Sequence, residues 1–198
     1  PVFLNQRGIE FRGGVDDRIF FYSNIVESQA RFANYVTQRI KRDNAVPGSG
    51  FFKKYESSVF DITDGYDFLN AQAYLGFNVS DHVGVQLGHG KHFVGNGYRS
   101  LLLSDFANNY YYLKFNWRVW RFQLQNVFAE LATEAKRDAR DFLLPKKYMA
   151  SHYLDYNVTP NLSIGFFETV VFKRNNQFEL QYINPVILYR TVEQMIGS

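Results

Sequence analysis

The sequence predicts an all-β fold, and specifically an antiparallel up-and-down transmembrane β-barrel. Three observations predict it: apolar and polar residues alternate over long runs, short turns alternate with long connections, and aromatic residues gather at the ends of the runs. Of the 198 residues, 20 are Phe, 14 are Tyr and 2 are Trp. Such an aromatic excess favours strands and interfaces. We expect one domain over residues 1–198, with about eight or nine strands.

The composition excludes several classes of protein. There is no cysteine, which excludes a disulfide scaffold, cysteine-based zinc sites and a cysteine nucleophile. The 22 basic and 19 acidic residues give a net charge of only +3, too small an excess to indicate a nucleic-acid partner. No apolar run reaches the roughly 18 residues that a membrane-spanning helix needs. No cofactor is implied.

The alternation is clearest over residues 70–79, where Leu75 and Phe77 share one face and Gln72 and Asn78 share the other. This period of two indicates strands with one apolar face. The expected strands cover residues 8–15, 18–29, 67–79, 83–93, 110–118, 121–131, 147–158 and 162–172, with a ninth candidate over 178–183.

The connections between these strands also alternate. Short turns are expected at residues 16–17, 80–82, 119–120 and 159–161. Long loops are expected over 30–66, 95–109 and 133–146, with turn-like sequence at 40–50 and a short helix over 131–142. In outer-membrane barrels the short turns face the periplasm and the long loops face outside.

Alternation alone also fits a soluble barrel, whose apolar face would point inward. Three features favour the membrane interpretation. The strands are long, the polar face is rich in Asn, Gln and Gly, and aromatic residues mark both ends of residues 111–120. That span, tilted by about 40°, rises roughly 23 Å, close to the height of an apolar membrane band. Four charged residues are then expected to form ion pairs in the lumen: Arg118, Glu130, Asp155 and Glu168.

The most distinctive segment covers residues 86–107. Glycines at 84, 88 and 90 fall on the polar face, where they allow a bulky group to approach the sheet. Residues 95–97 (Gly-Asn-Gly) predict a tight turn, after which residues 101–103 (three leucines) are expected to pack inside. His89 and His92 are three apart on a strand, so they point to opposite faces and no metal site is expected.

This segment resembles the outer-membrane capsule-assembly (Wzi-like) family and its RemB-like gliding-motility relatives in Bacteroidota-type bacteria. The family pattern matches Gly95, Gly97, Ser100, Leu101, Leu103, Ser104 and Ala107. Supporting stretches are residues 145–152, 165–170 and 178–193, so that the resemblance runs from about residue 65 to 193. It implies a barrel with about twice as many strands, of which this chain is a fragment. The absence of a signal peptide and the MIGS terminus fit that expectation.

The resemblance also implies a function. It predicts a non-enzymatic scaffold in the bacterial outer membrane that attaches surface polysaccharide or capsule, or that serves a gliding or secretion apparatus. The expected partners are outer-membrane lipid, lipopolysaccharide, surface polysaccharide and other envelope proteins.

The loop after the glycine-rich strand mixes aromatic, charged and amide side chains, as glycan sites do. The candidate glycan-binding residues are Tyr98, Arg99, Asp105 and Asn108. The same loop could instead plug the barrel mouth. Two other functions stay open: a soluble β-barrel that binds a glycan or small ligand, and a barrel-borne hydrolase that uses Ser100 or Ser104 with a histidine.

Overall fold

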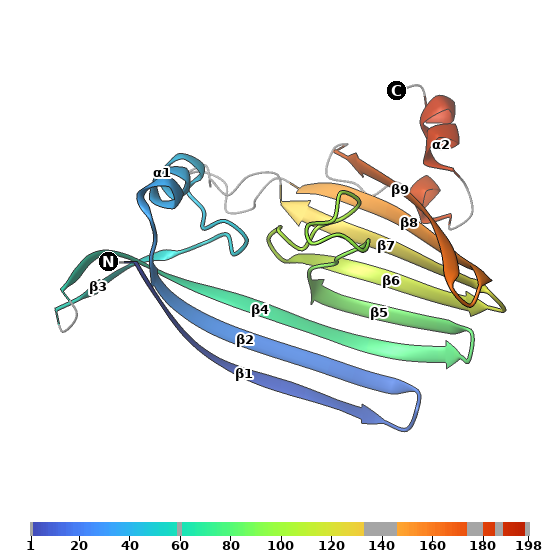
Figure 1. Cartoon of the computed structure of the whole chain (residues 1–198), viewed down its shortest axis with the longest axis horizontal. Coiled ribbons are helices and arrows are strands. Elements are labelled where there is room, and N and C mark those ends of the chain that lie inside the picture. The colour runs from blue at the N-terminus through green and yellow to red at the C-terminus, as the bar shows by residue number, and fades with distance from the viewer. Residues whose placement is uncertain (1, 59–60, 133–145, 174–179, 185–187, 197–198) are drawn as a thin grey trace.

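The structure, a computed structural model, describes residues 2–58, 61–132, 146–173, 180–184 and 188–196. Its main feature is one open, antiparallel sheet of nine strands (Figure 1). Eight strands follow one another across the sheet: β1 (Phe3–Val15), β2 (Ile19–Arg31), β4 (Ile62–Ser80), β5 (Val83–Gly90), β6 (Tyr110–Val119), β7 (Phe122–Ala132), β8 (Lys146–Thr159) and β9 (Leu162–Phe172). The predicted all-β, up-and-down arrangement is confirmed.

Four tight hairpins join β1 to β2, β4 to β5, β6 to β7 and β8 to β9, and all lie at the same end of the sheet (Figure 1). Asp16 and Trp120 take positive φ angles of 51° and 55° in two of these turns. Such left-handed residues match the twist of tight hairpins. The four short turns that the sequence predicts are therefore confirmed, and we call this the hairpin end.

The segment over 30–66 is more structured than the long loop expected there. Helix α1 (Asn34–Asp43) and strand β3 (Lys53–Ser57), which pairs with β4, lie within it. Ile40 of α1 packs among Ala30, Tyr66 and Phe68. The turn-like prediction for residues 40–50 is confirmed over 44–50, whereas residues 40–43 form the last turn of α1.

The C-terminal part differs from the expected ninth strand. Residues Leu180–Ile183 form a 3₁₀ helix, η1, and Tyr189–Ile196 form α2. Proline at position 185 and the loss of alternation after Phe172 favour an end to the sheet here. The helix expected over 131–142 lies mostly outside the described residues, although Leu131 and Ala132 belong to β7.

Strand register separates two faces across the sheet. One unbroken row of opposed residues runs Gly13, Phe21, Leu75, Leu87, Leu113, Phe128, Ala150 and Val170. The adjacent row on the opposite face runs Gly14, Phe20, Gly76, Gln86, Lys114, Val127, Ser151 and Thr169. Alternation along each strand therefore becomes an apolar face and a more polar face.

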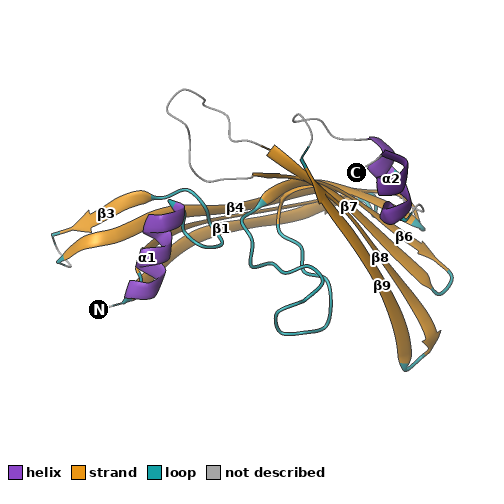
Figure 2. Ribbon diagram, turned by 90° about the horizontal axis from the view of Figure 1, so that it is seen from above, coloured by secondary structure: helices purple, strands orange, loops and turns teal. Residues whose placement is uncertain are grey.

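The sheet is bent (Figure 2), and the face of Lys114 and Tyr112 lies on the inside of the bend, on the side of the loop over 91–109. The loop over 91–109 hangs within the bend, where His92 packs on Tyr112, while α2 lies on the opposite side, where Tyr189 packs with Phe128. We call the two sides the concave face and the convex face. Core packing gathers beneath these covering segments, at the end of the sheet away from the hairpins.

Candidate functional site

The concave face carries a ladder of amide side chains near the hairpin end. Asn78, Gly84, Asn116 and Gln125 stand opposite one another on four successive strands. The Gln125 amide donates to Asn116 Oδ1 at 3.3 Å. A cavity of about 700 Å³ lies over this ladder, and Lys114 also lines it. Neutral donors and acceptors beside a cation suit a polar, hydroxyl-rich ligand.

Of the glycines at 84, 88 and 90, for which the sequence predicts close approach of a bulky group, Gly88 shows it. A Cβ at Gly88 would lie 2.6 Å from Tyr74 Cβ and 2.8 Å from the Tyr112 hydroxyl. A Cβ at Gly76 would overlap the Phe20 ring. The aromatic rings lie flat over the strands because glycine leaves room for them.

The loop over 91–109 is held together by Ser100. The Ser100 hydroxyl donates to the Val94 carbonyl and accepts from the backbone N–H groups of Leu102, at 3.0 Å, and Leu103, at 3.4 Å. Val94 also pairs with Leu103 through a backbone hydrogen bond of 2.9 Å. Gly95 has a φ of 114°, a conformation that L side chains rarely adopt, and a Cβ there would lie 2.7 Å from Ser100 Oγ. These motif residues thus build the loop.

His92 anchors this loop to the sheet. Its backbone N–H donates to the Tyr110 hydroxyl at 3.1 Å, and its ring lies edge-on to Tyr112 with centroids 4.2 Å apart. Burial, together with the charge on Lys114, lowers the pKa of His92 to about 4. His92 is therefore neutral at physiological pH.

A second tether runs from Lys91 to the segment after α1. Lys91 Nζ donates to the Gly48 carbonyl at 2.7 Å. Burial lowers the pKa of Lys91, and the charge of Asp105 acts in the opposite direction. The two long connections on the concave side are thereby linked.

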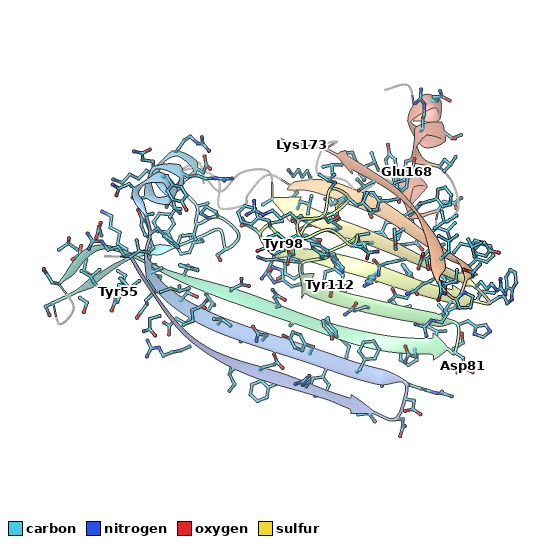
Figure 3. All side chains as sticks on the ribbon, in the orientation of Figure 1. Tyr55, Asp81, Tyr98, Tyr112, Glu168 and Lys173 are labelled. Carbon is cyan, nitrogen blue, oxygen red and sulfur yellow. The ribbon has the colours of Figure 1, made fainter. Side chains whose placement is uncertain are left out.

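The four candidate glycan-binding residues lie on the outer surface of the loop over 91–109. All four are exposed, and Tyr98 is 96% exposed (Figure 3). No hydrogen bond within the described part of the chain joins any two of them. Their distribution is that of a solvent-facing loop surface.

One packing expectation for this loop is wrong. Leu101 is fully exposed and Leu102 is 42% exposed, whereas only Leu103 packs toward Tyr110 and Tyr112. Three consecutive residues cannot all point inward from an extended strand or an open loop. The loop surface therefore combines the exposed Leu101 and Phe106 with the polar candidates.

Two charged side chains lie on the opposite face from the one expected. Glu130 stands in register with Tyr111 and Tyr148, and Glu168 with His152, so both belong to the convex face. The expectation used charge alone to assign a face, but in a strand the position parity decides it. Glu130 forms an ion pair with Lys146 at 2.9 Å near the loop end.

Glu168 belongs to a polar cluster that sequence reasoning missed. Asn126, His152 and Glu168 stand opposite one another on β7, β8 and β9. Tyr189 of α2 covers them, with its ring centroid 4.2 Å from that of His152. Burial raises the pKa of the Tyr189 hydroxyl, and the charge on Glu168 acts in the same direction. Trp117 Nε1 donates to Asn126 Oδ1 at 3.0 Å.

The serine and histidine side chains occupy separate environments. The Ser104 hydroxyl accepts from the Phe106 backbone N–H at 3.2 Å, as in a local turn. His89 lies on the convex face with its Nδ1 3.1 Å from the Ala71 carbonyl, whereas His92 lies on the concave side. Among the described residues no group of three or more His, Cys, Asp or Glu could hold a metal ion.

No helix within the described ranges is long and apolar enough to cross a membrane. Comparison of the chain with protein-family models, with curated proteins and with solved structures yields no match.

Proposed function

We propose that the chain forms part of the wall of a transmembrane β-barrel in the bacterial outer membrane. The observation that carries this proposal is the distribution of polarity on a bent sheet. The convex face exposes large apolar side chains, such as Leu87 at 62% and Phe166 at 63%. The concave face carries Lys114 and the amide ladder. A soluble barrel has the reverse arrangement, with the apolar residues inside.

The ends of the wall support the same proposal. Tight hairpins lie at one end and long connections at the other, as in outer-membrane barrels. At the hairpin end Trp120 is 75% exposed beside Phe122 and Tyr156, whose rings stack with centroids 4.5 Å apart. Exposed aromatic clusters of this kind suit the boundary between acyl chains and head groups.

Among the described strands, the outer edges of β1 and β9 have no partner. In a membrane each unpaired backbone group costs several kcal/mol, so spanning sheets close on themselves. We therefore infer that the wall belongs to a larger barrel whose other strands pair with these two edges. The resemblance of the segment over 95–107 to capsule-assembly proteins supports the same inference.

For its biological role we propose a non-enzymatic surface scaffold that attaches polysaccharide or capsule, or that serves gliding or secretion machinery. Two serines that a hydrolase could use are engaged in backbone hydrogen bonds instead, which supports a structural role for Ser100 and Ser104. The exposed loop around Tyr98 and Leu101 offers a surface for such partners.

Tryptophan fluorescence tests the membrane proposal. Trp117 lies on the convex face and Trp120 in the hairpin turn three residues later. A tilted strand places Trp117 about 8 Å deeper. In vesicles with brominated acyl chains, we expect a Trp120→Phe variant to be quenched best by deep bromines and a Trp117→Phe variant by shallow ones.

The same preparation also defines the result that would contradict the membrane proposal. A protein that stays monomeric without detergent, and whose tryptophans respond to aqueous acrylamide but to no brominated lipid, would support the soluble glycan-binding alternative. For the scaffold role, replacing Tyr98, Arg99 and Asp105 together by Ala should reduce capsule retention or gliding. Unchanged behaviour of both would remove the loop as the attachment surface.

A further inference from the structure

We propose that the cavity at the hairpin end of the concave face binds a carboxylate-bearing sugar through Lys114. This inference rests on the proposed function in one respect, because the concave face is taken as the enclosed side of a barrel. It concerns a different place from the exposed loop, at the other end of the strands. Asp81 marks that end in Figure 3, and Tyr98 marks the loop.

The first argument is the environment of Lys114. Its neighbours in register are Gln86 on β5 and Val127 on β7, neither of which carries charge. The side chain is half-buried, yet none of the ion pairs formed by the described residues includes it. A half-buried cation without a carboxylate is costly, and a bound anion offsets that cost.

The second argument is the position of the acidic groups. Asp17 and Asp81 line the cavity, but both belong to hairpin turns at its rim and are exposed. Arg18 and Arg118 also line it. The deeper part therefore presents positive charge, and the rim is mixed. A carboxylate drawn into the cavity finds its counter-charge at Lys114 rather than at the rim.

The third argument is the chemistry of the cavity floor. Asn78, Asn116 and Gln125 supply amide donors and acceptors from three strands, which can bind hydroxyl groups. Phe20 lies flat over Gly76 and lines the same cavity, so one face of its ring is available for stacking. An aromatic face, several amides and one lysine together match a uronic acid better than a bare inorganic anion.

The volume is consistent with this ligand class. The cavity measures about 700 Å³. Pockets that hold small molecules span roughly 300–1,000 Å³, so one or two sugar rings fit. The ligand class is thus set by charge at one point and by hydroxyl-binding groups around it.

Calorimetric titration of the full chain folded in detergent tests the site. The probe is digalacturonate, and cellobiose serves as the neutral disaccharide. We expect cellobiose to bind at least about tenfold more weakly. Lys114→Gln keeps a hydrogen-bonding group but removes the charge, and it should weaken digalacturonate binding by about tenfold or more. Lys53→Gln, on the exposed strand β3 outside the cavity, should leave binding unchanged.

Three results would overturn the proposal. One is a failure to bind digalacturonate in a sample whose electrophoretic band still shifts on heating in SDS. That result would preserve the barrel proposal and remove only this site. Another is equal binding by wild type and Lys114→Gln. The third is inorganic phosphate displacing digalacturonate at equal concentration, which would reduce the site to one for any anion. If the electrophoretic band of the complete barrel, with the strands that pair with β1 and β9, fails to shift on heating, the barrel proposal itself is contradicted.

Discussion

A pair of adjacent arginine substitutions measures which solvent contacts the convex face. Ile25 lies halfway along β2, on the convex face, opposite Ile9 and Ala71, and is 44% exposed. Asn24 is its neighbour on the concave face, opposite Glu10. Ile25→Arg and Asn24→Arg therefore add the same charge at the same depth on the two faces of one strand.

The expected magnitudes differ strongly between the two solvents. A tilted strand of this length places Ile25 roughly 16 Å from either end, close to the bilayer middle. An arginine facing lipid at that depth costs about 2–4 kcal/mol, which is about 30-fold to about 900-fold in the unfolding equilibrium. If water covers this face, a substitution at such an exposed position changes stability by about 0.5 kcal/mol or less.

The assay is urea unfolding of each variant in phospholipid vesicles, followed by tryptophan fluorescence. We expect Ile25→Arg to lose about 2–4 kcal/mol. Asn24→Arg should stay within about 1 kcal/mol of wild type, because its guanidinium faces Glu10 on the polar side. Equal losses for the two variants would refute the assignment of the convex face to lipid.

Three further substitutions test the local packing of the concave side. Gly76→Val should lower the free energy of unfolding by about 1–3 kcal/mol because the new Cβ meets the Phe20 ring. In a double-mutant cycle, Phe20→Ala should relieve most of that loss, and additive losses would contradict this explanation. Ser100→Ala should expose the 91–109 loop to limited proteolysis because it removes the acceptor and donor that close it, while a cleavage rate equal to wild type would show that other contacts hold the loop. Burial and the charge on Lys114 hold the pKa of His92 at about 4, below the 6.5 of the unfolded chain. Between these two values the unfolded state binds more protons, so the free energy of unfolding should fall by about 3 kcal/mol as the pH is lowered from 6.5 to 4. His92→Asn should remove that slope in pH-dependent urea titrations, and a slope that persists would assign it to another group.

The strands could be predicted because their signal is local. Residues 70–79 alternate strictly, and that alternation predicts this part of β4 and the opposite directions of Leu75 and Gln72, although β4 begins earlier, at Ile62. The hairpins could be predicted for the same reason, since turn residues interrupt the pattern at regular places. The register that aligns Leu75 with Leu87 follows once the turn length is known.

The covering segments could not be predicted because their structure depends on distant residues. Helix α1 is stabilised by Ile40 against Tyr66 and Phe68, more than twenty residues away in the chain. Likewise, the sequence does not indicate that Tyr98 is exposed and His92 is buried. His92 is buried because it packs on Tyr110 and Tyr112, which lie elsewhere in the chain. That Lys114 forms no ion pair with a described residue depends on which side chains the neighbouring strands place beside it, so the sequence alone could not show it.

The convex face is not uniform, and its polar positions bear on where lipid can touch it. In the loop half of the sheet, Arg7 of β1 forms an ion pair with Glu27 of β2, and Glu130 forms one with Lys146. Asn126, His152 and Glu168 interrupt the apolar rows, and a carboxylate there could not face acyl chains without a large cost. Tyr189 lies over them and is itself only 2% exposed, so α2 takes the place of solvent at this part of the sheet. Toward the hairpin end of the same strand β9, Phe166 is 63% exposed. The proposed lipid contact therefore covers the hairpin half of the convex face, while α2 of the same chain covers the loop half of β7 to β9.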